Sequence, residues 1–499
     1  MSARSGHSES VVALDHALRL GASLAVTTAV ALGVRLLVPR VLGPGDFGEL
    51  RLAESYADLL LVLLTFGIDS QLRREAATDP ARTLRSLGGL TVLRVALGAL
   101  AVAAVVAILH RTGASRTVVA VFVGLGVSQV LVVLNNTYAA FEHAAGDVSW
   151  LARTNIGMKV GWAGITVLAL SAWRTGLAVA LVGLAVEAVR FAWLTRRARR
   201  QHGLLLRPDL RLASGMVLAS VPLFVNALAH TFYARVGTGW LGAVSGPVEV
   251  GLYGAASNVA SLALLGMPIL TWVLVPSAAR AAASSGDDMR GLVTGTLRLS
   301  LLGAVPVALA CAVAAPQVLA LCFGPGFAGA VPMLRALAPT FALAYVSTVC
   351  AIALLQEGRA WTMAAVSLAG VVASVPLNAW LIGGGGVALG VPGGGAGAAW
   401  ATLITEVTVT AVLAGLTWRS WCEPRLLRTT AGLAGVAALA VAAALTRPVS
   451  GVLPALLAAV AAVAAVSVAG GIGSDDVAFV SHAWQRRRAP APVLAVEVL

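Results

Sequence analysis

The sequence contains little charge. Only 11% of its 499 residues are Asp, Glu, Lys or Arg, whereas 59% are hydrophobic. Soluble globular domains carry about 25% charged residues, so this composition excludes an ordinary soluble protein. Lysine is almost absent, since Lys159 is the only one, and the net charge of +13 therefore comes from arginine.

Motifs of the common enzyme classes are also missing. The sequence has no G-x-x-x-x-G-K-[ST] loop for ATP, no HExxH motif or Cys/His cluster for a metal, and no serine or cysteine with an evident base. We therefore expect no enzymatic activity, no catalytic residue, no metal and no resident cofactor. The cysteines show no CxxC spacing, which argues against a disulfide framework and favours small apolar packing residues: Cys311, Cys322, Cys350 and Cys422.

Long apolar stretches dominate what is present. There are fourteen, each of roughly 18–25 residues, about the length that an α-helix needs to cross a hydrocarbon core ~30 Å thick. Backbone groups in lipid must bond within their own segment, so the sequence predicts an all-α integral membrane protein with 14 transmembrane helices. The predicted spans are 14–38, 48–69, 87–109, 117–140, 148–171, 175–195, 214–235, 250–275, 293–314, 332–355, 360–382, 396–418, 429–446 and 452–471.

Arginines lie almost entirely on alternate connectors between these spans. Twenty fall on the side that includes both tails, and five fall on the other side: Arg40, Arg111, Arg116, Arg174 and Arg447. By the positive-inside rule both termini are cytoplasmic, which requires an even number of crossings. We expect a multi-pass protein of the bacterial cytoplasmic membrane, whose positive charge faces anionic lipid head groups rather than nucleic acid.

The chain divides into two sets of six spans and a tail. The segments are a cytoplasmic tail (1–13), an N-lobe (14–195), a basic cytoplasmic linker (196–213), a C-lobe (214–418), two further helices (429–471) and a second cytoplasmic tail (472–499). The sets are related, because LRVALGA at 93–99 recurs as LRLSLLGA at 297–304, and Gly48 matches Gly251 at nearly the same offset. We predict a parallel pseudo-repeat, with a central cavity between two six-helix lobes.

Ionisable groups inside the spans are candidate functional residues, because each is costly in lipid unless it pairs or meets water. Arg35 and Glu54 lie at similar depth on either side of the turn Gly43-Pro44-Gly45, and Asp58 is one helical turn beyond Glu54. A pair between Arg35 and Glu54 would either stabilise this hairpin or line a cavity and exchange for substrate. Both alternatives stay open at this point.

Lys159 falls near the bilayer centre, where it needs a partner carboxylate such as Asp58 or Glu54, or an anionic ligand. Arginine suits phosphate because its planar guanidinium donates two hydrogen bonds at once. We predict a cavity that binds a diphosphate, lined by Arg35, Arg94, Lys159, Arg298, Arg235 and Asn226. The candidates for coupling to H+ or Na+ are Glu54, Asp58, Glu406 and His230. Interfacial anchoring is the alternative for Arg235 and Arg298, and simple packing is the alternative for His230.

Four segments resemble a known family. The first opens with a helix, an LGP-x-x-FG turn and a second helix that ends in LG-[IL], a pattern found in the polysaccharide-export (Wzx-type) flippases of the multidrug/oligosaccharidyl-lipid/polysaccharide exporter superfamily. The LGPGDFG turn and the EVGLY segment are fairly specific, and the resemblance extends over most of residues 14–420. The segments are Val38–Asp69, Val221–Gly242, Val248–Val259 and Leu321–Pro339.

This resemblance implies alternating access that moves an undecaprenyl-diphosphate-linked oligosaccharide to the outer leaflet for cell-surface polysaccharide biosynthesis. It also implies a polysaccharide polymerase and glycosyltransferases of the same pathway as partners, besides the lipid-linked oligosaccharide and the bilayer. The chain departs from the family pattern at Gly237, which follows Tyr233-Ala234-Arg235-Val236 where many relatives have an aspartate. The mode of ion coupling is therefore open.

Three other functions compete with this one. A cation-coupled multidrug exporter of the same superfamily needs a net acidic cavity, whereas the charges inside these spans are balanced or basic. A flippase for the peptidoglycan lipid precursor fits the fourteen spans equally well. A non-transporting scaffold of an envelope complex is favoured by the missing aspartate in the seventh span.

Overall fold

The computed structural model describes residues 2–65, 80–144, 148–202, 221–267 and 286–418, together with Leu72, Leu270, Leu274 and Ala278. Over these residues the secondary structure is helical, without strands. Eight of the described helices are long and apolar enough to cross a membrane. The prediction of an all-α membrane protein is confirmed. The last two predicted spans, 429–446 and 452–471, lie outside the described residues, so the count of fourteen stays a prediction.

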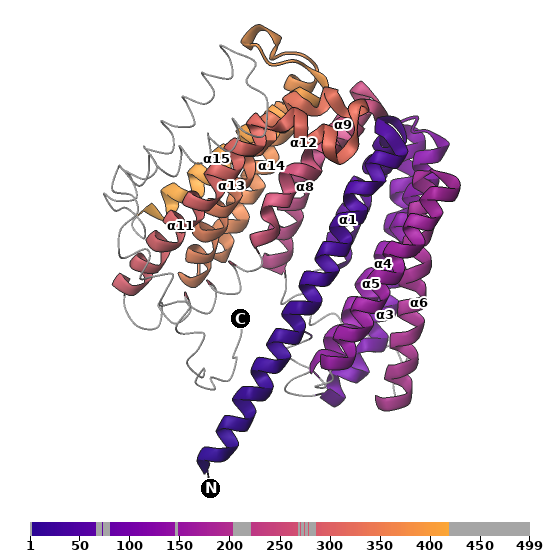
Figure 1. Ribbon diagram of the computed structural model, residues 1–499, viewed down its shortest axis with the longest axis vertical. Coiled ribbons are helices and arrows are strands. Elements are labelled where there is room, and N and C mark those ends of the chain that lie inside the picture. The colour runs from indigo at the N-terminus through magenta and orange to yellow at the C-terminus, as the bar shows by residue number, and fades with distance from the viewer. Residues whose placement is uncertain are drawn as a thin grey trace. The chain divides into compact units, whose positions relative to one another are not determined.

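The described helices fall into two compact units. The first comprises residues 2–42 and 49–231, and the second comprises residues 43–48 and 232–418. The first unit contains most of α1 (Ser2–Thr65) and then α3 (Pro80–Arg111), α4 (Arg116–Ala144), α5 (Val148–Trp173), α6 (Gly176–His202) and the start of α8 (Val221–Ser245). Figure 1 shows α3, α4, α5 and α6 of this unit running alongside one another.

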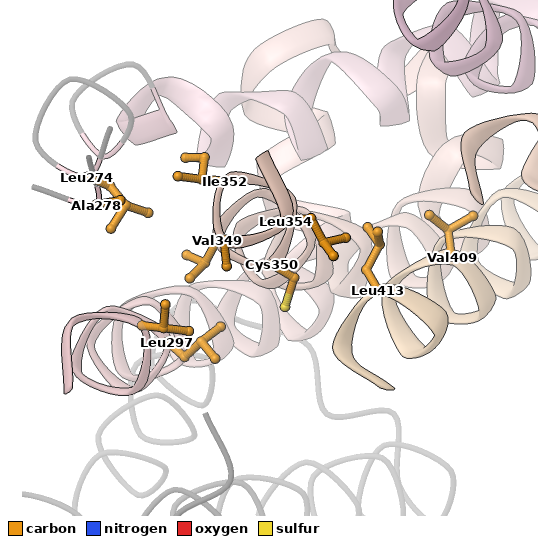
Figure 2. Packing of buried hydrophobic residues seen from close by; sticks show 11 residues of the cluster. Leu274, Ala278, Leu297, Val349, Cys350, Ile352, Leu354, Val409 and Leu413 are labelled. Carbon is orange, nitrogen blue, oxygen red and sulfur yellow. The ribbon is translucent and has the colours of Figure 1, made fainter. Parts of the chain in front are cut away.

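The second unit holds the rest of the described chain. After the end of α8 it contains α9 (Pro247–Leu262), η1 (Ala263–Gly266), α11 (Gly286–Val313), α12 (Ala315–Phe323), η2 (Pro325–Ala330), α13 (Val331–Gln356), α14 (Ala360–Ile382), η3 (Val387–Leu389) and α15 (Gly394–Leu416). Helix α13 packs against both α11 and α15. Figure 2 shows the resulting core, in which Val349, Cys350 and Leu354 of α13 are fully buried. The interpretation of Cys350 as a small apolar packing residue is confirmed.

Two described helices extend beyond the predicted membrane spans. Helix α8 continues to Ser245, whereas the sequence predicts an end at residue 235, and α6 continues through its arginines to His202 instead of ending at residue 195. Hydropathy marks where side chains leave the lipid, but a helix ends where its backbone hydrogen bonds end. Arginine is a good helix former, so α6 extends beyond its apolar part.

Helix α1 combines the first two predicted spans, and its backbone leaves the helical conformation at Gly43, with φ 74° and ψ 173°. Gly246, which precedes α9, has nearly the same geometry, with φ 81° and ψ 178°. In both places the next residue is a proline, which has no N–H and is favoured in the first turn of a helix. A positive φ is readily adopted only by glycine. The predicted turn at Gly43-Pro44-Gly45 is confirmed, and the turn at Gly246 was not predicted.

These two turns contact each other through their backbones, within the second unit. A Cβ added to Gly48 would collide with the carbonyl oxygen of Pro247, and a Cβ added to Gly251 would collide with the carbonyl oxygen of Pro44. The contact is reciprocal, because each glycine faces the proline of the other turn. The similarity of Gly48 and Gly251 seen in the sequence therefore corresponds to a direct packing contact.

We expect Gly48→Ala to destabilise the protein, because its methyl group meets a backbone atom that cannot rotate away. Overpacking of this kind costs about 1–3 kcal/mol. Gly45→Ala in the same turn is the matched control, since a Cβ at Gly45 meets nothing within 4 Å. Thermal unfolding in detergent micelles measures both variants. Equal unfolding midpoints for Gly48→Ala and Gly45→Ala would show that the glycine contact does not constrain the fold.

Candidate functional site

Arg94 is the largest fully buried side chain of the described residues, with 1% of its surface exposed. It lies on α3 and donates hydrogen bonds to the Val133 carbonyl (3.3 Å), to the Thr137 hydroxyl of α4 and to the Thr65 carbonyl of α1 (3.3 Å). The guanidinium therefore links three helices of the first unit. A role of Arg94 in binding substrate stays a prediction.

A polar cluster joins α4, α5 and α6 in the same unit. The Asn135 amide donates to the Glu187 carboxylate (2.7 Å) and to the Glu187 carbonyl (3.0 Å). Arg190 lies 3.7 Å from the same carboxylate and donates to the Asn155 side chain (3.0 Å). Glu187 and Arg190 are three residues apart on α6, so they form a local pair along one helix. The two asparagines were missed, although a polar amide in an apolar span is a recognisable signal.

Lys159 lies beside this cluster on α5. Its side chain is half-buried, and its Nζ atom is 4.2 Å from the centre of the Trp162 ring, which is a cation–π arrangement. Glu187 and Arg190 are the charged groups within electrostatic reach. The single lysine is thus placed against an aromatic face and within electrostatic reach of a carboxylate–guanidinium pair.

Glu54, one of the partners suggested for Lys159 and for Arg35, is held elsewhere. Its carboxylate accepts a hydrogen bond from Arg51 at 2.7 Å, three residues earlier on the same helix. Residues three apart on a helix are neighbours whatever the surrounding packing. Glu54 therefore pairs with Arg51 on its own helix. The similar depth of residues in the hairpin had suggested Arg35, which precedes the turn, as its partner.

The second unit has its own buried polar pair. The Tyr233 hydroxyl of α8 donates to the Glu406 carboxylate of α15 at 3.3 Å, and both side chains are partly buried. Gly237 lies four residues after Tyr233 on α8. The Oδ1 atom of Asn378, on α14, lies against this glycine. This oxygen is buried and has no hydrogen-bond partner among the described residues. Gly237 therefore lies against an amide oxygen.

The remaining predicted site residues are distributed over both units. Arg298 is 6% exposed on α11 and Arg235 is half-buried on α8, in the second unit. In the first unit Arg35 and His230 are exposed and Asp58 is half-buried, whereas the side chain of Asn226 lies outside the described residues. Their joint action in one cavity stays a prediction. In the described ranges no three His, Cys, Asp or Glu side chains are grouped as metal ligands.

A further ion pair lies at the arginine-rich end of α6. Arg197 contacts the Glu142 carboxylate of α4 at 3.2 Å, and Glu142 is 1% exposed. The Arg197 guanidinium also stacks 3.9 Å from the centre of the Trp150 ring. The sequence analysis missed this pair because Glu142 lies just beyond the predicted end of its span.

Comparison with known proteins gives one family and one fold. The model of a family described as polysaccharide biosynthesis protein matches residues 15–281. The lipid II flippase MurJ in an inward closed conformation has a TM-score of 0.67 at 10% identity, with 91% of this chain and 99% of that chain covered. An inward-facing multidrug resistance MATE family transporter of the MOP superfamily has a TM-score of 0.63 at 15% identity, with 81% and 97% covered. No curated protein matches the sequence.

We expect Arg94→Ala to lower stability strongly, because it leaves a cavity and removes three hydrogen bonds between helices. Large-to-small substitutions in a core cost about 2–5 kcal/mol. Arg111→Ala, at the exposed end of the same helix, is the control and should change the unfolding midpoint little. Thermal unfolding in detergent is the measurement. An Arg94→Ala protein as stable as Arg111→Ala, but defective in transport, would assign Arg94 to the substrate instead.

Proposed function

Because this chain belongs to the family of polysaccharide biosynthesis proteins, we propose that it moves a lipid-linked oligosaccharide across the cytoplasmic membrane of a bacterium. Its fold is that of transporters of the MOP superfamily, and its eight described apolar helices make it a multi-pass membrane protein. The cargo is an undecaprenyl-diphosphate-linked oligosaccharide that passes from the cytoplasmic to the outer leaflet. Both termini are cytoplasmic.

The observation that carries this proposal is a cation held inside an apolar helix. A phosphate-bearing head group cannot cross hydrocarbon unassisted, because an unpaired charge is prohibitively costly there. Lys159 supports binding of such a group, since it is half-buried beside Trp162 and close to Arg190. Arg35, Arg94, Arg235 and Arg298, with Asn226, complete the proposed set of substrate contacts.

The driving force is a coupled monovalent cation, H+ or Na+. One positive charge that crosses the membrane contributes about 2.3 kcal/mol per 100 mV. Glu406 is the strongest candidate for its site, because its carboxylate is partly buried and accepts a hydrogen bond from the neutral Tyr233 hydroxyl. Glu54, Asp58 and His230 are further candidates. Glu54 is already bonded to Arg51.

Two transport alternatives follow from the structural neighbours. A MATE-like protein would export cationic drugs, and a MurJ-like protein would carry the peptidoglycan lipid precursor. The cluster around Lys159 favours an anionic cargo over a cationic drug, because Lys159 and Arg190 outnumber Glu187 there. A scaffold protein would transport neither a lipid-linked substrate nor a drug. The partners of the pathway are a polysaccharide polymerase and glycosyltransferases.

In proteoliposomes the protein should transfer lipid-diphosphate sugars and should not export cationic dyes. Lys159→Ala should reduce the transfer rate by about tenfold or more, the equivalent of about 1.4 kcal/mol of binding. Arg116→Ala, an exposed arginine at the start of α4, is the control and should transfer normally. Dye export without lipid transfer would support the MATE-like alternative, and a preference for lipid II would support the MurJ-like one. Normal transfer by Lys159→Ala would remove Lys159 from the site.

Glu406→Gln should abolish the effect of an ion gradient on the transfer rate, while leaving the slow transfer without a gradient. Glutamine keeps the hydrogen bond from Tyr233 but can neither bind a proton nor balance a cation. Glu357→Gln is the control, because Glu357 is exposed and pairs locally with Arg359. Transfer rates are compared with and without H+ and Na+ gradients. A Glu406→Gln protein that still responds to the gradient would place coupling at another residue.

A further inference from the structure

The hairpin of α5 and α6 contains an open apolar groove. The two helices are joined by Arg174 and Thr175 and pack along each other (Figure 1). A cavity of about 570 Å³ lies between them and is lined by both, with Thr175 as its polar exception. Trp173 and Val189 of its lining are 68% and 56% exposed. The cavity is therefore accessible from outside the hairpin and is not part of a sealed core.

Missing side chains create this space on the α5 side. Gly157 and Gly161 both line the cavity, and a Cβ added to either would meet nothing within 4 Å. The Trp162 ring, which lies under the Lys159 ammonium, is part of the same wall. The groove thus adjoins the charged cluster that the proposed function assigns to the head group.

The same face of α6 ends in arginines. Ala178, Ala185, Ala192 and Arg199 follow one another at seven-residue spacing, which keeps them on one side of the helix. The first two line the apolar groove, whereas Ala192 and Arg199 line a second cavity of about 470 Å³ together with Arg196 and Arg200. The apolar groove and the cavity lined by three exposed arginines therefore follow one another along one side of α6.

We propose that this groove seats the polyprenyl chain of the lipid-linked substrate, with the diphosphate at Arg196, Arg199 and Arg200 before transport. The proposal rests on the proposed function and names a docking site for its substrate. Planar guanidinium groups suit a diphosphate, which offers several anionic oxygens. The apolar walls suit the hydrocarbon chain, whose burial is favourable by about 25 cal/mol per Å².

The distance along α6 from the far end of the groove to the arginines selects a long chain. At ~1.5 Å per residue, α6 from its start beside Thr175 to Arg196 extends over ~30 Å, the full hydrocarbon thickness. A phospholipid acyl chain reaches only through its own leaflet, half of that distance. An extended polyprenyl chain can follow the whole groove while its head group stays at the arginine-rich end.

A second copy of the protein fits the groove less well. The spacing Gly157-x-x-x-Gly161 resembles that of helix pairs in membranes. However, two copies related by a twofold axis along the membrane normal would oppose identical residues, so the arginines of both copies would approach one another. That like-charge repulsion disfavours a dimer through this face.

The test uses a polyprenyl diphosphate that carries photoreactive diazirines along its chain, with the full-length protein in nanodiscs. After illumination, labelled peptides are located by mass spectrometry. We expect labels on residues 157–189. Unlabelled undecaprenyl diphosphate should compete for the site, whereas undecaprenol and dioleoyl phosphatidic acid should compete at least tenfold less well, because one lacks the diphosphate and the other the long chain.

Three variants and two controls test the walls and the arginines. Gly161→Leu fills the groove from α5 and Val189→Phe fills it from α6, so each should reduce labelling by about tenfold. Gly164→Leu is the control, because Gly164 also faces open space but does not line the groove. The triple variant Arg196→Gln, Arg199→Gln, Arg200→Gln should remove the preference for the diphosphate over undecaprenol. Arg111→Gln with Arg116→Gln, at other helix ends, should preserve it.

Several outcomes would overturn the proposal. Labels that persist in both Gly161→Leu and Val189→Phe would exclude the groove, and equal competition by phosphatidic acid would make it a site for bulk lipid. A protein that elutes as a dimer and becomes monomeric in Gly161→Leu would make it an interface between copies. The proposed function is tested separately, by measuring transfer of lipid-diphosphate sugars in proteoliposomes. Transfer without groove labelling refutes only the groove, and groove labelling without transfer refutes only the transport function.

Discussion

The absence of water from the hydrocarbon core constrains every polar group in this protein. Lipid offers no hydrogen-bond partner to a buried donor or acceptor in a span, so leaving such a group unpaired is costly. Arg94 meets the requirement with acceptors on two other helices, and Glu187 meets it with an asparagine and an arginine. The polar side chains thus decide which apolar helices lie together, since helix packing in lipid lacks a hydrophobic driving force of its own.

The elements were predictable from the sequence because they depend on local properties. Apolar length located the spans, and the sequence Gly43-Pro44-Gly45 located the break at Gly43. The partners of the charged groups were harder to predict from the sequence. Glu54 pairs with Arg51, and Lys159 lies against Trp162, because these contacts depend on the rotation of each helix about its axis. Hydropathy does not report that rotation.

Burial of the candidate site residues was predictable from residue type, but their arrangement was not. Buried cations in apolar spans pointed to Arg94, Lys159 and Arg298, and the structure buries or half-buries all three. The asparagines that accompany them carry no charge and were overlooked, as was the groove. The groove forms because glycines of α5, which have no side chain, face α6. Its prediction requires knowing which face of α5 packs against α6. In the first unit Trp162 both lines that groove and contacts the Lys159 ammonium.

The contact of Gly48 with Pro247 and of Gly251 with Pro44 has a consequence for the history of the chain. A pair of surfaces in which each half contributes the same residues to the other is what two identical subunits form about a twofold axis. For a chain built by tandem duplication, the ancestral half-length protein would have associated with a copy of itself through this glycine–proline contact. Gene fusion would then have converted an association between subunits into packing within one polypeptide.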